Sequence, residues 1–503
     1  FFIARDVVRC HTSRKAVVAW MMALAVGLSS YGVYQYFVGM PAVRAEFEAL
    51  PEKEKTLALA QIGVNAHASS PELKQFLDRL ESTEPPATFG LANSFAGFLV
   101  SWSIMAIPVL LFFLWKTNAP KQPTRLAKWF FPCGCVIVAL CIVLTKSRAA
   151  WVALMVGGMV MCWFVARPAR KRWALPLGLL GLAATLLAVG VAVGAVDAQV
   201  LTEARVSMTY RWQYWSATLH MIDDHWFLGV GAGNFQNYYT QYKWPEASEV
   251  IADPHQFLLE LWATLGLVPF VCTVAYLVWR MVGALRDLPA GESTEARNEN
   301  VIGDSSAWTS GGKITPFAAV LSGGVAGCFM SVLYRLTFQQ SLEFLPTIPL
   351  PVVWVLVLPV TAFTFWHLHG WIANGPWCRW WCLVAVGTLA INLLAAGGIS
   401  FAAVALTIWL LLALSDECGV AKGSKRWVGV VLGGIVALVL WLMISTLNPV
   451  LQRQRHLLDF QRHLEFIAVP SPNDRTDSYR HVTQADASLQ AAIQADRRSP
   501  VPP

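Results

Sequence analysis

Long apolar runs dominate the sequence, and short polar segments separate them. About eleven of these runs have the length that a bilayer requires of a helix, roughly 17–25 residues. The pattern therefore predicts an all-α polytopic membrane protein with about eleven transmembrane helices. The predicted spans are residues 16–38, 91–115, 129–145, 149–166, 174–196, 256–279, 316–335, 347–366, 377–394, 399–415 and 427–446.

Composition and charge agree with this pattern. Of the 503 residues, 56% are hydrophobic and 14% are charged, as is typical of a polytopic membrane protein. With the N-terminus inside, most basic loop residues lie on the inner side, as the positive-inside rule requires. The outer turn after the third span holds only Lys146 and Arg148, and the outer turn near 394–399 holds none. The net charge of +7 is accounted for in this way, and we expect no nucleic-acid partner.

The polar segments divide the chain into domains. The N-terminal segment and first span are followed by an outer soluble segment, a membrane core with an outer loop between spans five and six, a flexible inner linker, the remaining spans and an outer tail. Their bounds are 1–38, 39–90, 91–282 (outer loop 197–255), 283–315, 316–446 and 447–503. The tail resembles the start of a helical repeat, and the opening apolar residues resemble the end of an earlier span. We therefore expect a truncation at the N-terminus, and one at the C-terminus is an open alternative.

Helical periodicity extends into both outer segments. After Pro71 one apolar stripe recurs at helical spacing: Leu73, Phe76, Leu77 and Leu80. In the outer loop four residues share one helical face: Arg211, Trp215, Thr218 and Ile222. The spacing predicts a helix in each segment, and the second helix is expected to lie along the membrane surface.

No metal site or cofactor is predicted. The ten cysteines lie in predicted spans, inner loops or the N-terminal segment, where small buried side chains are the ordinary interpretation. Asp223 and Asp224 are adjacent on a predicted helix and point about 100° apart, so they do not form a paired site. The chemistry is therefore expected to depend on fixed cations and a proton acceptor.

Two cationic points are predicted on the outer side. Arg148 lies in a turn of about three residues between two spans, where a guanidinium clamps phosphate or reaches lipid headgroups. Position alone does not decide between these interpretations, and Lys146 favours the second. Arg211 lies among aromatic residues of the outer loop, as in any interfacial helix, and Arg205 is a second cation or a solvated charge.

His255 is the best candidate for proton transfer. It lies where the outer loop re-enters the membrane, and a neutral imidazole there is able to accept a proton from an attacking hydroxyl. Asp253 is placed to orient the ring, although Pro254 lies between the two. The alternative is a histidine that caps the sixth span.

A glycine-rich stretch, Gly229-Val-Gly-Ala-Gly-Asn234, precedes this histidine. It resembles a phosphate-binding loop, but no strand precedes it as a dinucleotide-binding fingerprint requires. We interpret it as a tight turn that brings backbone close to a substrate or to a neighbouring helix. Gly231, Gly233 and Asn234 are its candidate substrate-binding residues.

These motifs together resemble the bacterial O-antigen ligase and polymerase superfamily. The shared features are a Ser-Arg turn in Thr145-Lys-Ser-Arg-Ala-Ala-Trp151, Arg211 before Trp215, the stretch Leu228–Phe235, and His255 before Gly266. Ala87–Ala96 also resembles the family's entry into an earlier span, so the resemblance covers residues 87–285. Gln256, Trp226 and Thr264 depart from the family pattern, which leaves contacts to the acceptor open.

The resemblance implies an enzyme that needs no metal or cofactor. Such a membrane glycosyltransferase moves a glycan from a polyprenyl-diphosphate carrier to a glycan, lipid or protein acceptor at the outer face of the bacterial inner membrane. Carried over to this sequence, Arg148 and Arg211 hold the diphosphate and His255 activates the acceptor hydroxyl, with inversion. We expect Arg148, Arg211 and His255 to converge on one outward-opening cavity.

Two other classes of function stay open. A transporter or flippase would move the lipid-linked glycan without bond chemistry, and it would need cations spread through the bundle. A structural scaffold would depend on the tail instead of on His255. The concentration of cations at the outer face favours the enzyme.

Overall fold

The computed structural model describes residues 11–61, 64, 71–115, 127–165, 198–247, 251–286, 316–338, 353–416, 456 and 482–491. The chain divides into two compact units, Phe1–Cys418 and Gly419–Pro503. In the second unit residues 482–491 are helical. The predicted spans 174–196 and 427–446, and most of the inner linker and outer tail, lie outside the described residues.

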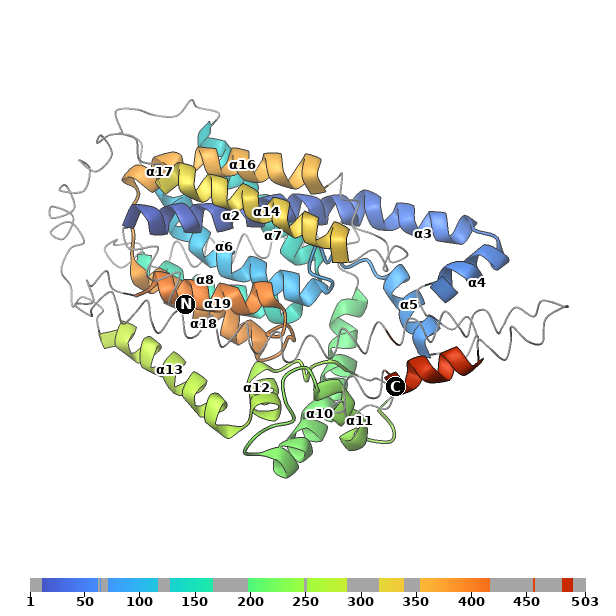
Figure 1. The fold of residues 1–503 in the computed structure, drawn as a ribbon. Helices are drawn as coiled ribbons and strands as arrows, with labels where there is room; N and C mark the ends of the chain where they lie inside the picture. Colours follow the sequence, from blue (N-terminus) through green and yellow to red (C-terminus); the bar gives the residue numbers. More distant parts are fainter. Residues whose placement is uncertain are drawn as a thin grey trace. The chain divides into compact units, whose positions relative to one another are not determined.

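The first unit is helical throughout its described elements (Figure 1). Its N-terminal half contains α2 (His11–Tyr34), the π-helical turn η1 (Gln35–Gly39), α3 (Met40–Ala49), α4 (Glu52–Gln61), α5 (Pro71–Glu81), α6 (Ala92–Trp115), α7 (Ala127–Leu144) and α8 (Arg148–Val165). The next elements are α10 (Ala198–His225), α11 (Phe235–Tyr242), α12 (Phe257–Leu265), α13 (Leu267–Arg286) and α14 (Pro316–Phe338). The unit ends with η3 (Val353–Val357), α16 (Leu358–His367), α17 (His369–Asn374), α18 (Arg379–Leu393) and α19 (Ala402–Leu414).

Several of these helices suit a membrane. Four described stretches are long and apolar enough to cross one: His11–Ala49, Ala92–Leu114, Arg148–Val165 and Val355–Asn374. Shorter apolar helices are Trp129–Leu144, Leu267–Gly283, Phe317–Cys328, Arg379–Leu393 and Ala402–Leu414. Each of them overlaps a predicted span, so the all-α, multi-pass character is confirmed for the described residues, whereas the number eleven is not.

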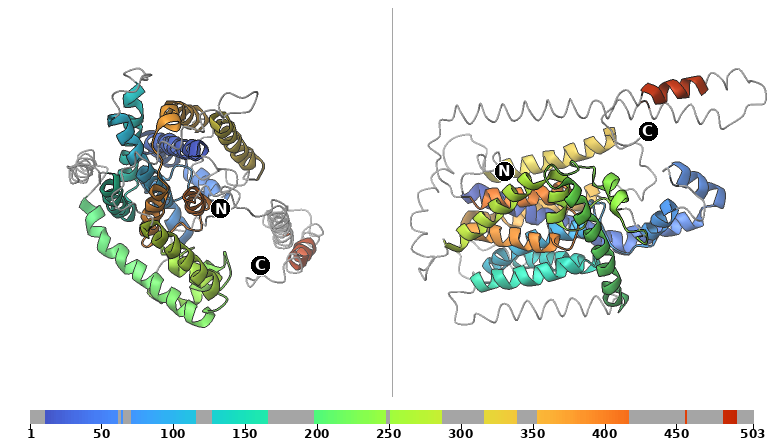
Figure 2. Two further views of the ribbon diagram at one scale, coloured as in Figure 1. Left: turned by 90° about the vertical axis from the view of Figure 1, so that its left-hand side faces the viewer. Right: turned by 90° about the horizontal axis from the view of Figure 1, so that it is seen from below.

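The bundle is built around α2, which packs against α16, α7, α14 and α6, while α6 packs against α18 and α8 (Figure 2). Glycines make the closest approaches. A Cβ placed on Gly27 of α2 would overlap Thr361 Oγ1 of α16, and one on Gly157 of α8 would overlap Thr388 Oγ1 of α18. Small residues of this kind let the backbones of membrane helices approach closely, which increases the dispersion contacts between them. In a lipid environment the hydrophobic effect does not drive helices together, so these contacts matter for association.

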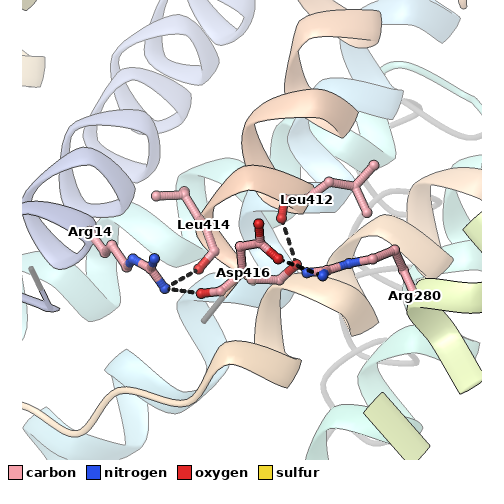
Figure 3. Close-up of polar contacts among 6 residues, drawn as sticks. Arg14, Arg280, Leu412, Leu414 and Asp416 are labelled. Atoms are coloured by element: carbon pink, nitrogen blue, oxygen red, sulfur yellow. Dashed lines mark hydrogen bonds and ion pairs between the residues drawn. The ribbon is translucent and has the colours of Figure 1, made fainter. Parts of the chain in front are cut away.

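A polar joint fastens α2, α13 and the end of α19 together (Figure 3). Arg280 Nη1 pairs with Asp416 Oδ1 at 2.6 Å, and Arg280 Nη2 donates to Ser415 Oγ at 2.7 Å. Arg14, only 2% exposed, donates to the backbone carbonyls of Leu414 and Asp416. Arg14 thereby satisfies backbone carbonyls at the C-terminal end of α19, where a helix leaves them without an intrahelical partner.

Both helices predicted in the outer segments are present. The stripe after Pro71 forms α5, and Phe76 packs on Phe47 of α3 with ring centroids 5.3 Å apart. The outer-loop helix is α10, on which Thr218 is fully buried and Ile222 is 4% exposed. α10 forms a small core of its own with α11 and α12.

The prediction of one continuous span over 256–279 is wrong. The chain forms the nine-residue α12 and the twenty-residue α13, and it breaks between them at Gly266 with φ of +82°. The break exists because the backbone of Phe227 and Leu228 lies against Gly266, where an added Cβ would overlap Phe227 O and lie 2.7 Å from Leu228 C. Hydropathy did not reveal this break, because the residues on both sides of it are apolar.

Candidate active site

The Ser-Arg turn between α7 and α8 is as short as predicted. Thr145 Oγ1 donates to Ile142 O at 2.7 Å, and Trp151 Nε1 donates to the same carbonyl at 3.0 Å. Lys146 has φ of +51°, and Thr145 and Ser147 are buried. The turn therefore holds Arg148 at the first residue of α8, where the helix dipole adds to its positive charge.

The structure brings Arg148 into electrostatic range of Arg211. The pKa of Arg211 is lowered first by burial and then by the positive charge of Arg148, with an opposing effect of Tyr214. Within the described residues, neither arginine has a carboxylate at ion-pair distance. Two partly buried guanidinium groups that have no carboxylate partner in the described part of the chain attract an anion, and an anion with several oxygens suits their forked donors.

Arg205 lies on α10, six residues before Arg211, and its side chain is outside the described part of the structure. The half-buried Lys146 lies two residues before Arg148 in the same turn.

Asp253 holds His255 through two hydrogen bonds. Asp253 Oδ1 accepts from the backbone N–H of His255 at 2.8 Å and lies 2.8 Å from ring Nδ1. Because a carboxylate only accepts, Nδ1 carries the hydrogen in this contact, and Nε2 is left as the proton acceptor. These contacts show that Pro254 does not keep the two side chains apart. The Asp253 side chain is 5% exposed and that of His255 is 34% exposed.

His255 has φ of +53°, a left-handed conformation that is uncommon outside glycine. Gln256, and not His255, caps α12: its side-chain oxygen accepts from the backbone N–H of Leu259. Trp215 Nε1 of α10 donates to Pro254 O at 3.1 Å and anchors the segment. The capping interpretation of His255 thus loses its support, and a strained backbone around a hydrogen-bonded ring is typical of a functional position.

Tyr214 links the histidine to the arginines. It is buried on α10, its ring meets that of His255 edge-on with centroids 5.9 Å apart, and it acts electrostatically on Arg211. Tyr214 is thus related to both His255 and Arg211, and Arg148 lies in electrostatic range of Arg211. The convergence of Arg148, Arg211 and His255 on one outward-opening cavity stays a prediction.

Glu260 lies one helical turn into α12, outside the apolar helices named above. Burial, and then the negative charge of Asp253, raise the pKa of Glu260 to about 8. Among the described residues its Oε2 has no hydrogen-bond partner. A carboxyl that is mostly protonated near neutral pH therefore lies beside the Asp253–His255 pair.

The glycine-rich turn packs against the end of α12. Gly229, Gly231 and Gly233 all have positive φ, and the N–H groups of Val230 and Gly231 donate to Ala263 O and Thr264 O at 2.8 and 2.9 Å. Asn234 Nδ2 donates to Val230 O at 3.0 Å and closes the turn. These contacts favour the interpretation in which the glycines bring backbone close to a neighbouring helix.

The remaining polar candidates have local partners. Asp224 accepts from Tyr242 OH at 2.8 Å, and the pKa of Tyr242 rises to about 12 through burial and this hydrogen bond. In the part of the chain that the structure describes, no three His, Cys, Asp or Glu side chains form a group that could hold a metal ion.

A family comparison covers the segment that carries these groups. Residues 133–274 match a family model described as O-antigen ligase. Over this segment, which is less than half of the chain, the match supports the resemblance to the O-antigen ligase and polymerase superfamily. The family indicates glycan transfer of the ligase type in general, with a lipid-linked glycan as donor and a glycan acceptor, and the apolar helices agree with a multi-pass membrane protein. Comparisons with curated proteins and with solved structures gave no match.

The match contains Arg148, Arg211, Asp253 and His255 but ends before α18 and α19. Sequence reasoning missed Tyr214, which looked like one more aromatic residue of an interfacial helix. It also missed Gly397, against which the Asp253–His255 pair lies. A Gly-Gly pair in an outer turn without charged residues was the available signal.

Proposed function

We propose that the chain is a metal-independent, inverting membrane glycosyltransferase. It transfers a glycan from a polyprenyl-diphosphate carrier to an acceptor hydroxyl at the outer face of the bacterial inner membrane. The observation that carries the proposal is the series of interactions that runs from the Asp253–His255 pair through Tyr214 to Arg211, which lies in electrostatic range of Arg148. The family match gives the reaction class in which these groups have a use.

His255 acts as the base in this proposal. Nε2 takes the proton of the acceptor hydroxyl as its oxygen attacks the anomeric carbon, while Asp253 holds Nδ1–H and stabilises the imidazolium that forms. The bond between the anomeric carbon and the carrier phosphate breaks, and its electron pair leaves with the polyprenyl diphosphate. One displacement inverts the anomeric configuration.

Arg148 and Arg211 stabilise the leaving group. Charge grows on the diphosphate oxygens as the glycosidic bond breaks, and preorganised cations in a partly buried site stabilise that charge more strongly than water would. The short turn before α8 and the packing of α10 keep both guanidinium groups in place before the substrate arrives. Arg205 and Lys146 add positive charge, and Gly231, Gly233 and Asn234 shape the wall near the substrate.

The proposed topology puts this chemistry outside. With the N-terminus inside and about eleven spans, the turn at Arg148 and the outer loop 197–255 face the same side, so the donor headgroup and the acceptor meet there. The acceptor is a glycan, a lipid or a protein. Membrane lipids surround the apolar helices.

The test is glycan transfer in proteoliposomes with a labelled polyprenyl-diphosphate donor and chelated metal. Wild type is compared with His255→Ala and with His220→Ala, which removes an exposed histidine from α10. We expect transfer by wild type and His220→Ala and a loss of about 10²–10⁴-fold in His255→Ala, the usual contribution of a general base. Equal rates in all three proteins would exclude His255 as the base. Carrier movement without product would indicate a transporter of lipid-linked glycan.

A further inference from the structure

The turn between α18 and α19 lies directly on the Asp253–His255 pair. A Cβ placed on Gly397 would overlap both Asp253 Oδ1 and His255 Nδ1, and it would lie 2.9 Å from Asp253 Oδ2. Gly397 is buried. The two atoms that it faces most closely are the acceptor and the donor of the hydrogen bond that fixes the imidazole.

The need for glycine at this position is steric. The backbone at Gly397 lies outside the left-handed region, so other residues are able to adopt its conformation, whereas Gly398 has φ of +122°. The requirement at Gly397 therefore comes from the space that the carboxylate and the ring occupy. A glycine required only by a tight turn would show the opposite: a positive φ and no close neighbour for an added Cβ.

The turn is fixed on both sides, so it is not free to move away from a new side chain. The N–H groups of Ala395 and Ala396 donate to Asn392 O at 3.2 and 2.9 Å, and that of Phe401 donates to Gly398 O at 3.1 Å. A Cβ on Gly398 would lie 2.7 Å from Ser94 Oγ of α6. The turn is thus packed against α6 at Gly398, while Gly397 faces the Asp253–His255 pair.

Exposure agrees with a covering role. The Asp253 side chain is 5% exposed under this turn, whereas the His255 side chain keeps 34%. A carboxylate shielded from water holds its hydrogen bond to the ring more strongly, because water does not compete for the same oxygen.

We propose that Gly397 is a positioning residue: it leaves the space in which Asp253 orients His255, and it closes that space to water. The α18–α19 turn, which lies outside residues 133–274, is thereby part of the catalytic unit. The effect on catalysis rests on the proposed function, whereas the effect on the Asp253–His255 geometry does not.

The first experiment reads that geometry without turnover. Wild type, Gly397→Ala and Gly387→Ala are labelled with ¹⁵N-histidine, and the His255 signal is assigned through its absence in His255→Gln. Gly387 is the matched control because it lies on α18, where, among the described residues, an added Cβ would meet only Met281 Cε, at 3.4 Å. We expect a protonated, hydrogen-bonded Nδ1 in wild type and Gly387→Ala, and a loss of that signature in Gly397→Ala. An unchanged signature in Gly397→Ala would overturn the proposal.

The second experiment is a double-mutant cycle on transfer. Gly397→Ala is expected to lower kcat by about 10²-fold, the effect of a small misplacement of a reacting group, and to shift the pH–rate profile. In an Asp253→Ala background the same change is expected to cost little, because the pair that it displaces is already broken. Additive losses would overturn the positioning role. Absence of transfer by the wild type would contradict the proposed function. The ¹⁵N experiment would then still test whether Gly397 positions the Asp253–His255 pair.

A further variant covers the case in which Gly397→Ala alone does not give folded protein. The Asp253→Ala/His255→Ala/Gly397→Ala triple variant removes both the carboxylate and the ring that the new Cβ would overlap. Recovery of a folded triple variant supports the steric relationship, and failure to recover it overturns the proposal.

Discussion

Asp253 and His255 share one oxygen: Asp253 Oδ1 accepts both the backbone N–H and the ring Nδ1–H of His255, each at 2.8 Å. The double contact ties the orientation of the ring to the local backbone, which takes a φ of +53° at His255. The imidazole is thus positioned by a residue only two places away, and its surroundings come from α10, α12 and the α18–α19 turn.

The first prediction concerns the carboxylate of Asp253. Asp253→Asn removes the charge that stabilises an imidazolium and lets the amide N–H₂ face Nδ1, so the ring is held in the wrong tautomer or released. We expect kcat for glycan transfer to fall by at least about tenfold while KM changes little. Steady-state kinetics in proteoliposomes measures this, with Asp223→Asn on exposed α10 surface as the control. Equal kcat in both variants would argue against an orienting role.

The second prediction concerns pH and Glu260. Burial raises its pKa from 4.5 to about 8, so the folded protein binds a proton that the unfolded chain releases. The stabilisation is fully present below about pH 4.5 and is lost as the pH rises through about 8. Glu260→Gln, which mimics the protonated group, should remove most of the loss of Tm between pH 6 and pH 9 in detergent.

Exposed Glu246 provides the control for this measurement. Glu246→Gln is expected to keep the pH dependence of the wild type. Parallel curves for wild type and Glu260→Gln would mean that Glu260 titrates normally.

The third prediction concerns the two arginines. Because Arg148 and Arg211 lie in electrostatic range of each other, a bound polyanion relieves their repulsion, and binding to the folded state raises Tm. Inorganic diphosphate is expected to stabilise the wild type, less so at high salt, and to have little effect on Arg148→Gln or Arg211→Gln. Lys74→Gln, which changes an exposed cation on α5, should respond as wild type does. An equal shift in all variants would place diphosphate elsewhere.

The fourth prediction separates two reasons for glycine in the turn before α11. Gly229 and Gly233 both have positive φ, +68° and +81°, so alanine costs about 1–2 kcal/mol at either position. At Gly229 the new Cβ would also lie 2.6 Å from the Thr264 backbone, whereas at Gly233 it meets no atom of the described residues within 4 Å. We expect Gly229→Ala to lower Tm clearly more than Gly233→Ala, and to expose the α12–α13 junction to protease. Similar losses would show that φ alone sets the requirement.

Much of this molecule follows from local pattern. Runs of apolar residues locate the described membrane helices, and spacing of 3.6 residues locates α5 and α10, because both signals lie within one segment. The short turn at Arg148 follows from two spans that nearly touch in sequence. Arg148, Arg211 and His255 were candidates from the sequence alone, because their positions between predicted spans and the family resemblance both point to them.

What the tertiary structure decided depends on segments distant in sequence. α12 separates from α13 at Gly266 because the Phe227 backbone lies there, and the hydropathy of residues 256–279 does not reveal this break. Tyr214 joins His255 to the arginines only once α10 packs on α12. The steric requirement for glycine at position 397 arises from Asp253 and His255, which are distant in sequence and lie against it in the folded chain. Hydropathy and periodicity report how strongly the residues of one segment tend to be buried and on which face. Steric fit between residues distant in sequence exists only after the chain has folded, so neither signal contains it.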